Sequence, residues 1–423
     1  MTQFDRRFML KALGLGGASL ALPVPAFARA TAKIVIIGGG FGGASAARML
    51  ATLLPSSSIT LVEANARYTA CPFSNLVLGT DRALSDQEFG YGGLTQLGVT
   101  VVTDTATDVD PISRTVTLQN ADDLTFDRLI LSPGIDMRWN ALEGYDEAAA
   151  QVYPHAWKAG PQTALLRQKL DALEDGQTVI MSVPTAPFRC PPGPYERASM
   201  IAHYLKTRKP RSKLIVLDAK DSFSKMALFQ EAWAEHYPDH LEWRGASDDG
   251  TVARVSASFG EVETDFETFS AGATNVIPPQ KVGFIADRAG VSDATGWCPI
   301  EPLAFESVLQ ANVHVIGDAT IAAPMPKSAF SANLQAKICA LGVARLVSGL
   351  GPEPTVLANT CFSFTTPDEA ISIAGVYSNA DGQLASISGA GGVSPLGADL
   401  SIRMQEAAQA RSWFNTITQE AFG

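Results

Sequence analysis

Five cysteines are the residues of this chain best suited to redox or nucleophilic chemistry. They are too few to form a disulfide scaffold for 423 residues, but they suffice for one bridge and one reactive thiol. Cys298 and Cys339, the latter in the middle of a predicted helix, are expected to be buried structural thiols. Cys71, Cys190 and Cys361 remain as candidates for chemistry. Cys190 stands in a proline-rich loop that would hold its sulfur in place, and Cys361 lies in an extended run.

A glycine-rich loop near the start of the chain predicts a dinucleotide-binding site. It follows a buried apolar strand predicted at 33–37 and precedes a helical pattern. Gly38 permits a tight turn, Gly40 lets the backbone approach a pyrophosphate, and Gly43 allows the helix to pack closely on the strand. A second predicted strand ends at Glu63, whose carboxylate is placed to accept hydrogen bonds from an adenosine ribose.

The far half of the cofactor site is predicted much later in the chain. A buried strand predicted at 313–318 ends at Asp318, and in flavoproteins with two dinucleotide-binding domains such an aspartate binds the ribityl chain of FAD. A helix predicted at 328–347 would stabilise negative charge on the flavin through its N-terminus. Lys327, directly before this helix, is assigned to the same site. The alternatives are an ordinary strand–turn–helix and a solvated lysine.

A second βαβ unit, with strands predicted at 178–181 and 214–218, lacks the residues that bind a nicotinamide cofactor. Its three glycine positions are occupied by Ser182, Pro184 and Pro187. Proline has no N–H for a phosphate, and its ring blocks the close approach that glycine allows. We therefore expect FAD to bind in the first unit and NAD(P)H not to bind in the second.

Length and charge narrow the class of protein further. A chain of 423 residues indicates two or three domains. Lys plus Arg number 32 and Asp plus Glu 43, so the net charge is −11. An acidic chain of this kind is not expected to bind nucleic acid, and it would suit a basic partner. No C-x-x-C-H sequence attaches a c-type haem, and no metal site is predicted.

The first 28 residues have the pattern of a twin-arginine signal peptide. Arg6 and Arg7 precede an apolar stretch at 12–25, and Ala26-Phe27-Ala28 has the spacing that a signal peptidase recognises. We expect cleavage after Ala28 and residence in the periplasm, with no later membrane span. The alternatives are an uncleaved anchor or an unrelated basic terminus.

These motifs together resemble the flavoprotein subunit of flavocytochrome c sulfide dehydrogenase, including the related flavoprotein of bacterial thiosulfate-oxidation (Sox) systems. The most specific pieces are the Cys190 loop with Glu196, the Gly-Trp-Cys-Pro sequence at Cys298, the Pro-Met-Pro-Lys-Ser sequence ending at Ser328, and the Asn-Thr-Cys sequence ending at Cys361. The resemblance implies an α/β fold with two dinucleotide-binding-type (Rossmann-like, glutathione-reductase-like) domains plus a C-terminal α+β interface domain.

The resemblance also implies how the domains and the site residues divide along the chain. The FAD-binding domain is expected at 31–140 and 295–351, the second βαβ domain at 141–294, and the C-terminal domain at 352–423. By resemblance, Cys71 forms a thioether with the flavin, and Cys190 and Cys361 form a redox-active disulfide beside it. Pro72-Phe73 after Cys71 departs from the family pattern.

The implied activity is oxidation of hydrosulfide to sulfur or polysulfide at the disulfide, with electrons passing singly to a c-type cytochrome subunit or a soluble cytochrome c. A hydrosulfide anion is a soft nucleophile, and a disulfide sulfur is a soft electrophile with a thiolate leaving group. Glu196 is a candidate proton acceptor or, alternatively, a helix N-terminal carboxylate without chemistry. Two other functions stay open: a redox-active accessory protein that maintains a thiosulfate-oxidising complex by thiol–disulfide exchange, and a sulfide:quinone oxidoreductase.

The predicted export signal gives a first testable prediction. N-terminal sequencing of the protein recovered from the periplasm should start just after Ala28, because signal peptidase cleaves there. Recovery of a chain beginning at Met1 or Thr2 would contradict it.

Overall fold

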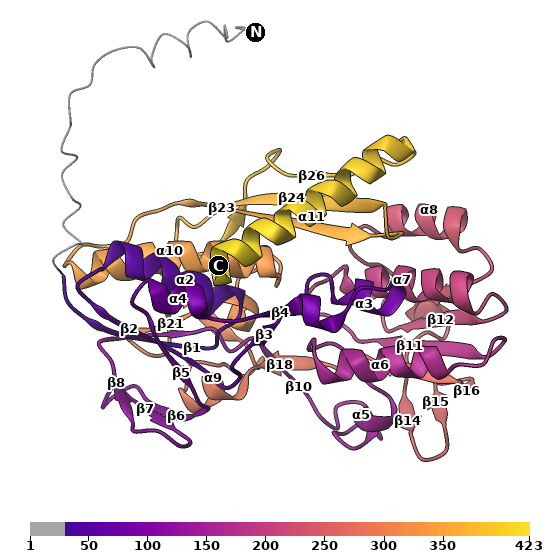
Figure 1. Cartoon of the computed structure of the whole chain (residues 1–423), viewed down its shortest axis with the longest axis horizontal. Coiled ribbons are helices and arrows are strands. Elements are labelled where there is room, and N and C mark those ends of the chain that lie inside the picture. Colours follow the sequence, from indigo (N-terminus) through magenta and orange to yellow (C-terminus); the bar gives the residue numbers. More distant parts are fainter. Residues whose placement is uncertain (1–29) are drawn as a thin grey trace, which may run out of the picture.

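The structure is a computed structural model that describes residues 30–423; the predicted signal peptide at 1–28 lies outside them. Two α/β lobes lie side by side, and the C-terminal strands and helix lie across both of them (Figure 1). The predicted α/β fold class is confirmed. None of the helices in the described part of the chain is both long and apolar enough to cross a bilayer.

The first lobe is built on a sheet whose central strands are parallel, in the order β21-β9-β1-β2-β5. Both faces of such a sheet are covered, so its strands are almost continuously apolar and buried, as β1 and β9 are. Strand β21 pairs with β9, so the chain returns to this sheet after building the second lobe. The strands of this core are β1 (Lys33–Ile37), β2 (Ser58–Glu63), β5 (Thr100–Thr103), β9 (Arg128–Leu131) and β21 (Val313–Val315).

Two helices pack against each other over this sheet, α2 (Phe41–Leu53) and α10 (Ala329–Val347). The helix predicted at 328–347 is confirmed, with Ser328 as its N-cap: the Ser328 hydroxyl accepts from the Ser331 N–H at 3.0 Å. The strand predicted at 313–318 is shorter than expected. It ends at Val315, because Gly317 takes a positive φ of 78° and a single 3₁₀ turn follows.

Smaller elements complete the first lobe and its junction with the second. The sheet is extended by β19 (Cys298–Glu301), β20 (Glu306–Ser307) and β22 (Thr320–Ile321), and a separate antiparallel sheet contains β6 (Ala106–Asp110), β7 (Thr115–Leu118) and β8 (Leu124–Thr125). The junction has the antiparallel pair β10 (Ile135–Met137) and β18 (Gln280–Val282), and α9 (Phe284–Arg288) packs against β6. The pair β3 (Tyr68–Thr69) and β4 (Glu88–Phe89), α3 (Ser74–Gly79) and α4 (Gly92–Gln96) lie between β2 and β5 in sequence.

The second lobe repeats the parallel arrangement with the strand order β13-β12-β11-β17. These strands are β11 (Thr178–Val183), β12 (Lys213–Asp218), β13 (Leu241–Arg244) and β17 (Ala273–Val276). The helices of this lobe are α5 (Ala149–Val152), α6 (Pro161–Ala172), α7 (Gly193–Arg208) and α8 (Met226–His236). An antiparallel sheet of β14 (Arg254–Ser256), β15 (Glu261–Glu263) and β16 (Thr268–Ser270) extends from it.

The C-terminal part combines a long antiparallel hairpin with one long helix. Strand β23 (Val356–Phe364) pairs along its whole length with β24 (Ala370–Ser378), and β24 also pairs with β25 (Ala385–Ser386) and β26 (Gly392–Val393). Helix α11 (Leu400–Phe422) lies against β24, β23 and α2 (Figure 1). Strand β23 contacts α10 of the first lobe and α7 of the second, so this part closes over the junction between the lobes.

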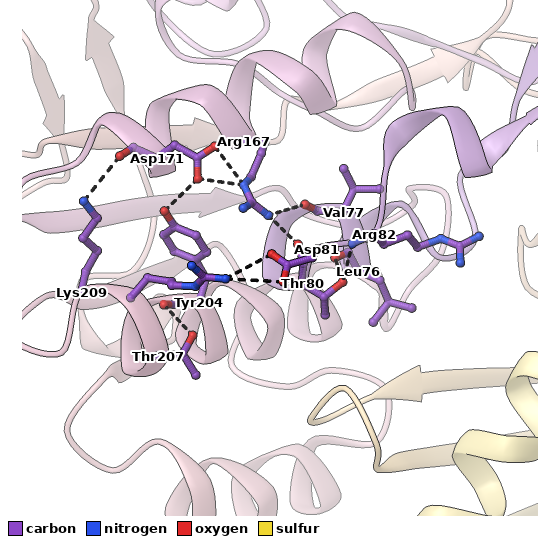
Figure 2. A network of polar contacts seen from close by, with 11 residues as sticks. Leu76, Val77, Thr80, Asp81, Arg82, Arg167, Asp171, Tyr204, Thr207 and Lys209 are labelled. Carbon is purple, nitrogen blue, oxygen red and sulfur yellow. Dashed lines mark hydrogen bonds and ion pairs between the residues drawn. The ribbon is translucent and has the colours of Figure 1, made fainter.

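A polar network fastens α3 to the second lobe (Figure 2). The Arg167 guanidinium, on α6, donates to the carbonyls of Val77 and Thr80 at 3.0 and 2.6 Å. Asp171 accepts from Arg167 and from the Tyr204 hydroxyl of α7, each at 2.9 Å. These bonds satisfy carbonyls at the end of α3 and fix the segment that directly follows Cys71.

Candidate active site

A cavity of about 480 Å³ lies where the two lobes and the C-terminal part meet. Its lining brings together most of the predicted site residues from distant parts of the sequence. They are Gly38, Gly40, Glu63, Cys71, Cys190, Glu196, Asp318 and Cys361. Gly43 and the side chain of Lys327 are not part of the lining.

The glycine loop requires the absence of side chains at two positions. Gly38 has a φ of +99°, and a Cβ there would lie 2.3 Å from the Ser132 carbonyl oxygen. At Gly43, a Cβ would lie 1.9 Å from the Gly38 carbonyl oxygen, so this glycine allows α2 to pack closely on the loop. Glu63, at the end of β2, accepts the Gly39 N–H at 2.7 Å, which holds the carboxylate at the cavity.

Asp318 shows that the other end of the cavity fits a ligand with hydroxyl groups. Its carboxylate faces the cavity, and no donor within the described residues reaches its buried Oδ1. Its Oδ2 lies 3.8 Å from the Arg189 guanidinium, and burial raises the pKa of the carboxyl. A buried acceptor without a partner is costly, so a donor from a ligand would complete this site. The glycine loop and Asp318 therefore fit the two ends of FAD.

Lys327 occupies a different place from the predicted one. Its ammonium donates to the carbonyls of Asp318 and Thr320 at 2.8 and 2.6 Å and lies 3.8 Å from the centroid of the Trp297 ring, and Lys327 is not among the lining residues. Burial lowers its pKa to about 8. Its carbonyl accepts the Cys190 N–H at 2.9 Å. Lys327 therefore ties the Cys190 loop to the turn before α10.

Cys190 is held in a strained turn. Its φ is +57°, its carbonyl accepts the Gly193 N–H at 2.8 Å, and a Cβ on Gly193 would lie 2.9 Å from the Cys190 sulfur. Burial raises the pKa of the Cys190 thiol, and the charge of a neighbouring Cys361 thiolate raises it further. Cys361 sits within β23 of the C-terminal part and lines the same cavity. All five cysteines are free thiols in the structure.

Of the other three cysteines, one lines the cavity and two are buried elsewhere. Cys71 lines the cavity, and its sulfur lies 3.9 Å from the Trp157 carbonyl oxygen. Cys298 and Cys339 are completely buried away from the cavity, as structural thiols are expected to be. The three cysteines predicted for chemistry thus share one cavity.

Glu196 lies between the three parts of the protein. It is on the first turn of α7, and it accepts the Phe364 N–H of β23 at 2.9 Å and the Asn75 amide of α3 at 2.7 Å. Burial raises the pKa of its carboxyl. A carboxyl in this position near Cys190 is a candidate proton acceptor.

Two buried cations near the cysteines were not found from the sequence. Arg197 donates to the Asn75 and Asn275 side chains and to backbone carbonyls before Trp157, and burial lowers its pKa to about 10. Lys225 reaches the C-terminal part from the start of α8 and contacts the Cys361 carbonyl. The sequence did contain one indication for Arg197, a charged residue on the buried face of an amphipathic helix. The sequence contained no such indication for Lys225, because its contacts exist only in the folded protein.

The second lobe encloses the carboxylate that a nicotinamide domain offers to a ribose. Asp218 ends β12 as Glu63 ends β2, but its carboxylate accepts from the Tyr195 hydroxyl at 2.7 Å, the Trp243 indole at 3.1 Å and the Lys220 ammonium at 2.5 Å. The Tyr195 ring stacks on Phe223 with centroids 3.5 Å apart. Protein side chains fill this place in the second βαβ unit.

The fold is that of FAD-dependent reductases with two dinucleotide-binding-type domains. A family model described as pyridine nucleotide-disulphide oxidoreductase matches residues 32–169. The models described as the central part of the sulfide dehydrogenase [flavocytochrome c] flavoprotein chain and as flavocytochrome c sulphide dehydrogenase, flavin-binding, match residues 163–278 and 353–422. The chain belongs to the family of the flavoprotein chain of flavocytochrome c sulfide dehydrogenase.

Individual proteins similar to this chain include sulfide dehydrogenase and sulfide:quinone oxidoreductases. The flavoprotein chain of sulfide dehydrogenase [flavocytochrome c] from Chlorobaculum thiosulfatiphilum is 55% identical over 47 residues, which are 11% of this chain and 98% of that sequence. Mitochondrial sulfide:quinone oxidoreductase from Dictyostelium discoideum is 25% identical over 293 residues, 67% of this chain and 64% of that protein. The solved sulfide:quinone oxidoreductase of Aquifex aeolicus has a TM-score of 0.70 at 17% identity, over 92% of both chains, and shows the same fold.

The filled second lobe predicts that neither NADH nor NADPH reduces the bound flavin. With millimolar NADH or NADPH under anaerobic conditions, the flavin absorbance near 450 nm should stay unchanged, because Asp218 and the loop at 184–192 leave no phosphate or ribose site. Dithionite in the same cuvette is the positive control. Bleaching by either nicotinamide cofactor would contradict this prediction.

Proposed function

We propose that this chain is a periplasmic, FAD-dependent sulfide dehydrogenase that is exported by the twin-arginine route and passes electrons to a c-type cytochrome. One observation carries the proposal. Cys71, Cys190 and Cys361 line one cavity. The glycine loop at 38–40 and a carboxylate oxygen of Asp318 without a hydrogen-bond partner in the described residues line it too. The family to which the chain belongs supports the substrate and the flavin.

The residues of the cavity have distinct roles in FAD binding. The loop at 38–40 and the start of α2 would hold the pyrophosphate, Glu63 the adenosine ribose and Asp318 the ribityl hydroxyls. Cys71 would form the thioether that retains the flavin in a compartment where it is not easily replaced. When bound, FAD supplies a two-electron acceptor that can release electrons singly.

The cysteine pair supplies the site of reaction with hydrosulfide. Attack by HS⁻ on the Cys190–Cys361 disulfide breaks the S–S bond, forms a persulfide on one cysteine and releases the other as a thiolate. Re-formation of the disulfide would release the sulfane sulfur, one proton and two electrons, and bound FAD would supply the acceptor for that electron pair. Glu196 is placed to take the proton, because burial has already raised its pKa.

The electron acceptor is proposed to be a c-type cytochrome that docks on the C-terminal part. The net charge of −11 suits a basic partner, and exposed apolar side chains gather in the segment between β25 and the first turns of α11. They are Val393, Leu396, Leu400, Ile402 and Met404. Resemblance to sulfide:quinone oxidoreductases favours a second candidate acceptor, a quinone.

Replacing either cysteine of the pair should stop sulfide oxidation. We expect Cys190→Ser and Cys361→Ser each to lower sulfide-dependent cytochrome c reduction by at least about 100-fold, because no electrophilic sulfur remains. FAD absorbance per protein should be unchanged, since Cys71 and the glycine loop are intact. The assay follows reduced cytochrome c spectroscopically.

The matched control is Cys339→Ser, which makes the same chemical change at a thiol buried in α10 away from the cavity. It should keep sulfide turnover. Wild-type rates in either cavity variant would refute the proposed mechanism, and sulfide-dependent quinone reduction without cytochrome reduction would favour the second acceptor.

Replacing Cys71 should change how the flavin is held. Acid precipitation of the wild-type protein should give a yellow pellet, whereas Cys71→Ser should release its flavin into the supernatant, because no covalent bond remains. The measurement is the 450 nm absorbance of both fractions. A colourless wild-type pellet would contradict the thioether.

A further inference from the structure

A buried asparagine lies directly beside the sulfur of Cys361. Asn359 and Cys361 are two residues apart on β23, so their side chains project from the same face of the strand. Asn359 is only 2% exposed, and its Nδ2 lies 3.2 Å from the Cys361 sulfur. An amide N–H at this distance is a hydrogen-bond donor to sulfur, and its effect is largest when the sulfur is charged.

The surroundings of Asn359 determine which end of its amide faces the sulfur. The Oδ1 atom accepts from the hydroxyls of Ser328 and Ser331 at 2.6 and 3.0 Å. Ser328 accepts the Ser331 N–H as the N-cap of α10, and the Asn359 oxygen is closer to its hydroxyl, at 2.6 Å, than the Ser331 hydroxyl, at 3.1 Å. Two donors therefore occupy the amide oxygen, and the NH₂ group is turned toward Cys361.

A positive charge approaches the same cysteine from the second lobe. The buried ammonium of Lys225 donates to the Cys361 carbonyl at 3.0 Å, the Ser363 hydroxyl at 2.8 Å and the Ile371 carbonyl at 3.3 Å. These acceptors are neutral, and within residues 30–423 no carboxylate forms an ion pair with Lys225. Burial lowers its pKa to about 8, so a nearby anion would stabilise its charge.

The titratable groups that face this position are few. Cys361 itself, Glu196 from α7, Cys190 from the preceding loop and Glu406 on α11 favour the Lys225 charge. Burial and a charge on Cys361 both raise the pKa of Tyr377 on β24. Cys190 lacks a comparable donor: no hydrogen bond to its sulfur occurs in the described structure, and burial raises its pKa. The two sulfurs of the pair are therefore in unequal environments.

We propose that Asn359 and Lys225 are positioning residues that make Cys361 the thiolate of the reduced cysteine pair. Asn359 donates to the sulfur, and Lys225 places a buried cation at the Cys361 carbonyl and the Ser363 hydroxyl. The inference rests on the proposed function in one respect, that Cys190 and Cys361 form the redox pair.

The first test measures the reactivity of Cys361 in the absence of sulfide and cytochrome. The holoenzyme is reduced with a phosphine, pulse-labelled with iodoacetamide between pH 5.5 and 9.5, and the Cys361 peptide is quantified by mass spectrometry. In Asn359→Ala, the pH at which the labelling rate is half-maximal should rise by about one unit. At pH values below that midpoint, labelling should then be about tenfold slower than in the wild type. The sign follows because the lost donor stabilised only the charged sulfur.

Lys225 gives a second, independent arm of the test. Lys225→Met should move the Cys361 labelling profile upward by about one to two pH units, whereas Lys225→Arg should keep it near the wild-type position because it keeps the charge. If Lys225 only supported the fold, Lys225→Arg and Lys225→Met would not differ in this way. If Asn359→Ala does not fold, Ser331→Ala removes one of the two hydroxyls that orient the amide and should give a smaller upward shift.

The matched control is Asn379→Ala, which removes another fully buried asparagine, at the end of β24, that bonds Thr355 and the Pro302 carbonyl. It should leave the Cys361 profile unchanged. Unchanged profiles in Asn359→Ala and Lys225→Met would overturn the inference, as would an equal shift in Asn379→Ala. Because labelling needs no sulfide, failure of sulfide turnover would refute the proposed function and not this assignment.

Discussion

The carboxylate of Glu196 is the contact on which the arrangement of the cavity depends. It joins the second lobe, through α7, to the β23 backbone at Phe364 and to the Asn75 amide of the first lobe. Hydrogen bonds to a charged acceptor are about twice as strong as neutral ones, and a buried carboxylate that lost them would be costly. Cys190 lies six residues before Glu196, and Cys361 lies three residues before Phe364. This junction therefore places both sulfurs on one cavity although they are far apart in sequence.

Buried cations lie around the cysteines of the cavity. Arg189, Arg197 and Lys225 are cations at or near the cavity wall, and burial raises the pKa of both Glu196 and Asp318. Burial thus disfavours the charged form of both carboxyls, whereas the neighbouring cations favour it. A hydrosulfide ion, a thiolate and a reduced flavin are all anions, and each would be stabilised by the same surroundings.

The sequence predicted those parts of the fold and site that depend on local pattern. The apolar strand at 33–37, the helix that follows Ser328 and the incompatible residues Ser182, Pro184 and Pro187 all act over a few neighbouring residues. Other features depend on contacts between distant segments. The contacts of the Lys225 ammonium and the orientation of Asn359 exist only once β23 has docked. The Lys327 ammonium bonds the Asp318 and Thr320 carbonyls, which the sequence could not predict. Loss of strand structure after Val315 also follows from the turn at Gly317, which apolar content alone does not reveal.

The two βαβ units of the chain differ in the loop that connects the first strand to the helix. In the first, residues 38–40 connect β1 directly to α2, and glycines bring the helix N-terminus to the cavity. In the second, residues 184–192 form a longer connection from β11 to α7, and Cys190 stands near the place where the pyrophosphate would lie. Tyr195 and Glu196 then begin α7, one closing over Asp218 and the other facing the cavity. The loop that lacks the glycines of a nicotinamide site is thus the same loop that brings Cys190 to the cavity.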